Sequence, residues 1–166
     1  MILGISCVTF TIVHVVISLI GIATGIIVLL GMLNDRRLDG ATAVFLATTV
    51  LTSVTGFMFP FSQLLPSHVV GAISLVVLAV ALIAFYGRHL SGAWRSIYIV
   101  TATIALYLNV FVGVVQAFQK VSFLRPLAPT QAEAPFIIAQ LAVLVLFAVL
   151  GLIALKTFYP DADAEA

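Results

Sequence analysis

The chain has 166 residues, of which 63% are hydrophobic and 8% are charged, and its seven basic and six acidic side chains give a formal net charge of +1. A soluble domain carries roughly 45–50% apolar and about 25% charged residues, so this chain has too few charges to cover a surface exposed to water. The composition excludes a water-soluble enzyme, a nucleic-acid binder with a basic stripe and a disordered chain. It predicts an integral membrane protein.

Five apolar segments are each long enough to cross a hydrocarbon core about 30 Å thick, which takes roughly 20 helical residues. They run from Val8 to Leu33, Ala41 to Phe59, His68 to Gly87, Ser96 to Phe118 and Pro135 to Phe158. Asp39 is a candidate N-cap for the second segment, and Pro135 suits the first turn of the fifth. The sequence therefore predicts an all-α bundle of five transmembrane helices in one domain over residues 1–160, followed by an acidic tail at residues 161–166.

Basic residues are divided unequally between the two ends of the predicted bundle. One end would hold only Lys120 and Arg125, and the other would hold Arg36, Arg37, Arg88, Arg95 and Lys156. Because the cytoplasmic loops of membrane proteins are enriched in Lys and Arg, the second end is predicted to be cytoplasmic. The N-terminus would then lie outside, and the four arginines of the cytoplasmic end would contact lipid headgroups.

Small residues at helical spacing indicate where the predicted helices touch. Gly21 and Gly25 lie four residues apart in the first segment, and Thr48, Thr52 and Gly56 form a similar row in the second. Helices in lipid associate through close packing and interhelical hydrogen bonds, which small and hydroxylated residues permit. We expect these five residues to lie at helix interfaces, either within the chain or in a dimer.

Asn109 is the most informative residue of the fourth segment, because an amide inside a bilayer must face protein or water. It belongs to a polar stripe at helical spacing that continues to Gln116. One interpretation is an interhelical hydrogen bond worth about 0.6 kcal/mol. The alternative is that Asn109 and Gln116 line a pocket entered from the outside.

Two histidines lie in the outer half of the predicted bundle. His14 is well inside the first segment, where it is either hydrogen-bonded to Thr11, Ser18 or a hydroxyl of the second segment, or a haem or metal ligand, a quinone partner or a proton relay. His68 opens the third segment and is either an interfacial residue or, with His14, an axial ligand of haem b. A difference in depth near 10 Å, at ~1.5 Å per residue, weighs against haem.

These polar residues concentrate in one leaflet, which predicts either a network in which they bond to one another or a ligand site formed by His14, His68, Asn109, Gln116 and Gln140. Such a site would be mostly apolar with a few polar groups. The connection from Gln119 to Ala134, with Arg125 and Glu133, would act as its lid. No Asp or Glu occurs between Gly40 and Ala132, which excludes ion transport through a membrane carboxylate, and no metal or other cofactor is expected.

Four stretches resemble a family of short bacterial polytopic membrane proteins of unknown function. They read TSVTGFMFPF from Thr52, PSHVVG from Pro66, ALYLNVFV from Ala105 and LAPTQ from Leu127. This resemblance implies a membrane bundle and brings no activity or site residues with it. The stretch HVVISLIGIATG from His14 is also similar to small haem-binding membrane cytochromes.

The combined prediction is a non-enzymatic protein of the bacterial inner membrane. It would be an accessory subunit or a binder of a lipid or quinone-like molecule, and the alternative is a haem b electron-transfer protein. Its expected partners are the lipid bilayer and either another membrane protein or a second copy of the chain, with no role for nucleic acid.

Overall fold

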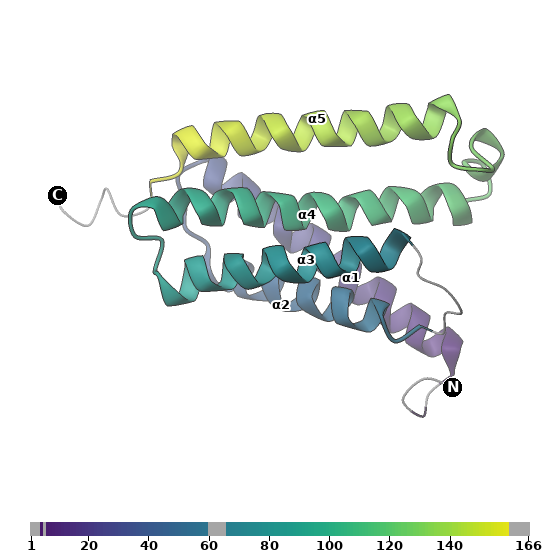
Figure 1. Ribbon diagram of the computed structural model, residues 1–166, viewed down its shortest axis with the longest axis horizontal. Helices are drawn as coiled ribbons and strands as arrows, with labels where there is room; N and C mark the ends of the chain where they lie inside the picture. Colours follow the sequence, from purple (N-terminus) through teal and green to yellow (C-terminus); the bar gives the residue numbers. More distant parts are fainter. Residues whose placement is uncertain (1–3, 5, 60–65, 160–166) are drawn as a thin grey trace.

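The computed structural model describes residue 4, residues 6–59 and residues 66–159, and within these residues it contains helices and no strands. Five α-helices run back and forth along a common direction (Figure 1). They are α1 (Cys7–Leu33), α2 (Asp39–Gly56), α3 (Pro66–Leu82), α4 (Ala93–Lys120) and α5 (Ala134–Thr157). A π-helical turn, η1 (Ile83–Gly87), extends α3, and a 3₁₀ turn, η2 (Arg125–Leu127), lies between α4 and α5.

Four helical segments are long and apolar enough to cross a membrane, namely Cys7–Leu33, Ser67–Gly87, Ala93–Lys120 and Ala134–Thr157. They confirm the all-helical class and the membrane-compatible character predicted from the composition. The remaining helix, α2, has 18 residues, and these include five threonines, Ser53 and Asp39.

The helix boundaries differ from the predicted ones by a turn or less, and the clearest difference is at the start of α2. The helix begins at Asp39 with Leu38 as its N-cap residue, so the prediction that Asp39 is the N-cap is wrong. Arg37 Nε donates to Asp39 Oδ1 at 2.6 Å and holds the carboxylate away from the backbone N–H groups. Pro135 lies in the first turn of α5 as predicted. The predicted acidic tail at residues 161–166 lies outside the described residues.

The central helix of the bundle is α4, which packs against α1, α3 and α5 and touches α2. Its neighbours α1 and α2 form an extensively packed antiparallel pair, while α3 packs against α2 and α4. α5 lies along the other side of α4 and also contacts α1 (Figure 1). The polar and aromatic residues of α4 are therefore surrounded by other helices more completely than those of any other element.

Two glycines of α1 allow α2 and α4 to approach closely. A Cβ atom on Gly25 would lie 2.6 Å from Leu106 Cδ1 and 2.8 Å from the ring of Phe45, and both neighbouring side chains are buried. A Cβ atom on Gly21 would lie 3.1 Å from Asn109 Nδ2. The Gly21 and Gly25 face is thus covered within the chain by α2 and α4.

Five basic residues lie at one end of the bundle, on the left in Figure 1, which we call the arginine-rich end. They are Arg36, Arg37, Arg88, Arg95 and Lys156. The Arg95 guanidinium donates to the carbonyl oxygens of Leu155, at 3.3 Å, and Phe158, at 2.5 Å. It also lies 4.1 Å from the centre of the Tyr159 ring, so Arg95 links the start of α4 to the end of α5.

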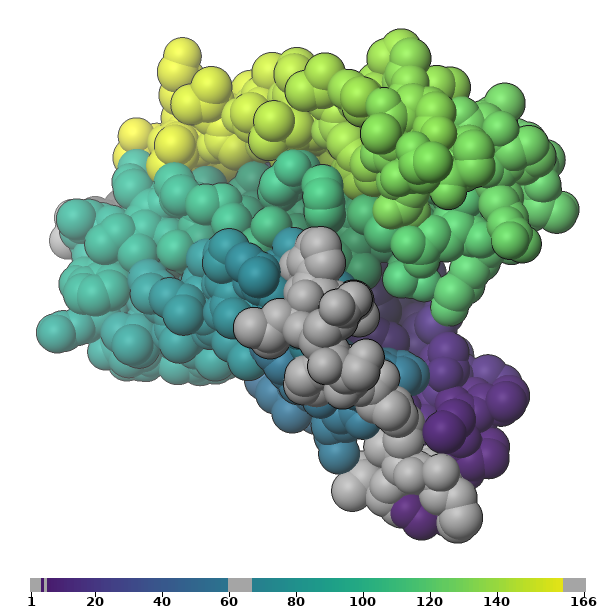
Figure 2. All heavy atoms as spheres, turned by 45° about the vertical axis from the view of Figure 1, so that its right-hand side comes forward, coloured from purple at the N-terminus to yellow at the C-terminus, as the bar shows by residue number. Residues whose placement is uncertain are grey.

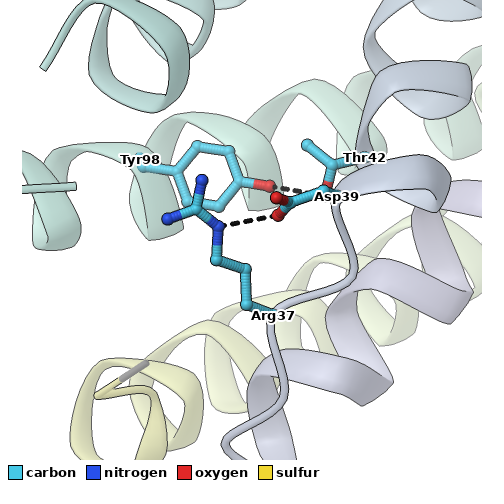
Figure 3. Close-up of polar contacts among 4 residues, drawn as sticks. All are labelled: Arg37, Asp39, Thr42 and Tyr98. Atoms are coloured by element: carbon cyan, nitrogen blue, oxygen red, sulfur yellow. Dashed lines mark hydrogen bonds and ion pairs between the residues drawn. The ribbon is translucent and has the colours of Figure 1, made fainter. Parts of the chain in front are cut away.

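Arg37 and Arg88 also contact aromatic rings of the protein at this end. Arg37 lies 4.9 Å from the centre of the Phe85 ring, and Arg88 lies 5.2 Å from that of Trp94. Figure 3 shows Arg37 paired with Asp39 beside the buried Tyr98, whose hydroxyl lies 3.4 Å from Thr42 Oγ1. The arginine-rich end is therefore held together by cation–π and hydrogen-bond contacts among four helices.

Candidate ligand-binding site

At the opposite end of the bundle, His14 is engaged in a hydrogen bond between α1 and α2. Its Nδ1 atom lies 2.7 Å from Thr55 Oγ1, and its ring packs edge-on against Phe59 with centroids 5.2 Å apart. Thr55 also donates to the Leu51 carbonyl oxygen, so its hydroxyl hydrogen is directed along its own helix. His14 Nδ1–H is then the donor to Thr55, and the partner is a hydroxyl of the second helix, one of the partners expected from the sequence.

Asn109 of α4 forms a second hydrogen bond between helices. Its partner is Ser18 of α1, one turn after His14. Ser18 Oγ donates to Asn109 Oδ1 at 2.9 Å, and the Asn109 side chain is buried. Asn109 Nδ2 has no hydrogen-bond partner in the described part of the chain. Asn109 and His14 therefore bind different partners on different helices, rather than turning toward a shared opening.

The two glutamines of the predicted site point in different directions. Gln140 is buried on α5 and donates from Nε2 to the Phe111 carbonyl oxygen at 3.2 Å, while its Oε1 has no partner among the described residues. Gln116 is exposed on α4. Asn109, Gln116 and Gln140 therefore do not share a site: Asn109 bonds to α1, Gln116 is exposed, and Gln140 bonds to the backbone of α4.

His68 is buried at the start of α3, and its ring lies 5.6 Å, centre to centre, from that of Phe57. Thr55, the partner of His14, lies two residues before Phe57 on α2, so both histidines contact the same end of this helix. The expected difference in depth near 10 Å between the two histidines, and the haem b alternative with it, stay predictions.

The described residues contain no group of three or more His, Cys, Asp or Glu side chains placed to hold a metal ion. A hollow of about 340 Å³ lies where α4 ends and the connection to α5 begins. Its lining consists of Phe118, Gln119, Arg125 and residues 128–131. We call it the Arg125 hollow.

The connection that forms this hollow is ordered by local hydrogen bonds. Glu133, the residue before α5, accepts from Thr130 Oγ1 at 2.8 Å, from Thr130 N at 3.2 Å and from Ala132 N at 3.1 Å. Gln131 Nε2 donates to the Val115 carbonyl oxygen at 3.2 Å and ties the connection to α4. Partial desolvation raises the pKa of Glu133, but the hydrogen bonds to its carboxylate outweigh this effect and hold the pKa below its usual value.

The connection therefore closes over the end of α4 rather than over His14 or Asn109. Sequence reasoning assigned Arg125 to a lid and did not identify Gln119 or Gln131 as part of a site. The stretch after Arg125 was the available signal, because it mixes apolar, proline and polar residues in a connection too rich in proline to be an α-helix.

Comparisons with models of known protein families, with curated proteins and with solved structures found no match to this chain. The fold and the four apolar segments define the class as a helical protein suited to a membrane, and the site is described from its own geometry.

Proposed function

We propose that this chain is an integral protein of the bacterial inner membrane that crosses the bilayer five times. The support for α2 as the fifth span is its alignment with α1. The two helices are in contact from His14 and Thr55 at one end to Gly31 and Leu38 at the other. These 18 residues of α1 extend about 27 Å, close to the ~30 Å of a hydrocarbon core. A helix that follows a spanning helix over this distance is itself a span.

The proposed orientation has the N-terminus outside and the C-terminus in the cytoplasm. Five basic residues lie at the arginine-rich end and two at the opposite end, which favours a cytoplasmic position for the former. The Arg125 hollow would then lie at the outer surface of the membrane. Tyr86, Trp94 and Tyr159 would lie at the cytoplasmic interface, where amphipathic aromatic residues are enriched.

The proposed activity is non-enzymatic binding of an amphipathic, lipid- or quinone-like molecule at the outer end. The observation that carries this proposal is the Arg125 hollow, whose lining includes Arg125, Gln119, Gln131 and the buried Phe118. His14, Asn109 and Gln140 form interhelical hydrogen bonds and do not line the hollow. The lining of the hollow is more polar than apolar, which suits the polar part of an amphipathic molecule.

Protection of a cysteine in the hollow tests this proposal. In a Cys7→Ser background, Gln119→Cys places a thiol in the hollow, and Val121→Cys places one on an exposed residue outside it. We expect membrane lipid extract, added to delipidated protein in detergent, to slow maleimide labelling of Gln119→Cys and to leave Val121→Cys unchanged. Equal labelling rates with and without extract at both positions would contradict ligand binding in the hollow.

A second candidate function, as an accessory subunit of a membrane assembly, rests on α5. This helix forms a ridge along one side of the molecule (Figure 2) and contacts only α4 and α1 extensively. Its large exposed hydrophobic residues are Ile137, Ile138, Leu141, Leu144, Val145, Leu146, Val149, Leu152 and Ile153. A surface of this kind suits lipid, a second copy of the chain or another membrane protein.

A further inference from the structure

We infer that the Arg125 hollow binds the phosphate group of a phospholipid in the outer leaflet. This inference rests on the proposed binding function and specifies its ligand. Three properties of the site carry it: the unpaired charge of Arg125, the volume of the hollow and the apolar side chains that border it.

Arg125 supplies a positive charge that no acidic group of the described chain neutralises. The guanidinium is exposed at the edge of the hollow, and the one ion pair in the described residues joins Arg37 to Asp39 at the other end of the bundle. Glu133 is the closest acidic residue in sequence, but its carboxylate is bound by Thr130 and Ala132. Arginine is well suited to phosphate, because its planar guanidinium donates two parallel hydrogen bonds.

The size of the hollow fits a headgroup rather than a whole amphipathic molecule. Its volume of about 340 Å³ lies at the small end of the range for ligand pockets, roughly 300–1,000 Å³. A complete quinone ring with its tail, or a lipid with both acyl chains, would extend beyond it. The hollow therefore holds the polar part of a ligand whose apolar part lies elsewhere.

Exposed apolar side chains of the connection and of α5 provide a place for that apolar part. Phe118 forms part of the lining and packs edge-on against Phe136 of α5, with centroids 5.5 Å apart. Phe123, in the same connection, is 70% exposed, and Ile138, further along α5, is 64% exposed. A phospholipid can place its phosphate on Arg125 and an acyl chain along the apolar residues of α5. A soluble phosphate would contact Arg125 alone, so a lipid phosphate is favoured.

Lipid affinities measured by native mass spectrometry test the inference. The full chain is titrated with each lipid and released from detergent in the instrument. The phospholipid probes are phosphatidylglycerol and phosphatidylethanolamine, and diacylglycerol with the same chains lacks the phosphate. Loss of hydrogen bonds to a charged group lowers affinity about tenfold or more, so we expect this effect for both phospholipids in Arg125→Gln. Arg125→Lys keeps the charge but lacks the planar guanidinium, so its phospholipid affinity should lie between those of the wild type and Arg125→Gln.

Lys120→Gln is the matched control, because Lys120 is an exposed cation at the same end of the bundle and does not line the hollow. Unchanged binding in this variant supports a specific site, whereas equal losses in Lys120→Gln and Arg125→Gln would show general contacts with headgroups and overturn the inference. Diacylglycerol binding as tight as phospholipid binding would also overturn it, although protection of Gln119→Cys would then still support ligand binding in the hollow. Glycerol 3-phosphate binding as tightly as the lipids would overturn the assignment to a lipid.

Discussion

The glycines of α1 determine how closely three helices of the bundle can pack. At Gly25 the missing Cβ leaves room for Leu106 of α4 and Phe45 of α2, and at Gly21 it leaves room for Asn109. The spacing of these glycines was enough to predict a helix interface, but it did not show whether the partner was within the chain. Which polar atoms pair, such as Asn109 with Ser18, depends on helix rotation and depth, which a single sequence does not specify.

Replacement of Gly25 by alanine should destabilise the bundle by about 1–3 kcal/mol, the usual cost of overpacking a core. The added methyl group would overlap Leu106 and Phe45, each 1% exposed. Gly113→Ala is the control, because its Cβ atom would meet only Ile22 Cδ1 at 3.7 Å, an ordinary contact. Thermal unfolding in detergent should show a lower midpoint for Gly25→Ala alone, and equal midpoints for both variants would contradict this packing.

The connection between α4 and α5 shows how an element without regular structure forms a site. The five helices could be predicted from apolar length, because a membrane requires long apolar helices whatever their tertiary contacts. The Arg125 hollow could not be predicted, because Phe118 and Gln119 come from a helix end while residues 128–131 return from the far side of η2. The hydrogen bonds of Glu133 and Gln131 bring these parts together.

The order of this connection should depend on the ionisation of Glu133. Because the pKa of the folded state lies below that of the unfolded state, the carboxylate stabilises the connection above about pH 4.3, the ordinary glutamate value, and this stabilisation is lost as the pH falls through the lowered pKa. Hydrogen exchange of residues 128–133 should therefore lose protection in acid. In Glu133→Gln, protection should already be low and should no longer change over that range, and a wild-type pH response in this variant would contradict the role of Glu133.

At the scale of the whole molecule, the side of the membrane on which each connection lies depends on the number of times the chain crosses the membrane. Four helical segments meet the length and apolarity needed for a span, and α2 is treated as the fifth because it accompanies α1 from His14 to Gly31. If α2 did not cross the membrane, α3, α4 and α5 would each cross in the opposite direction. The connection carrying Arg125 would then lie on the side opposite Cys7. The proposed lipid site would then lie in the cytoplasmic leaflet.

The most direct test is to label single cysteines in intact cells with a maleimide that does not cross membranes. The native Cys7 reports on the start of α1, Val121→Cys in a Cys7→Ser background reports on the connection, and Ser91→Cys in the same background reports on the turn between η1 and α4. The five-span proposal predicts that Cys7 and Val121→Cys are labelled in intact cells and that Ser91→Cys is labelled only after permeabilisation. Labelling of Cys7 and Ser91→Cys without Val121→Cys would contradict it and indicate four spans.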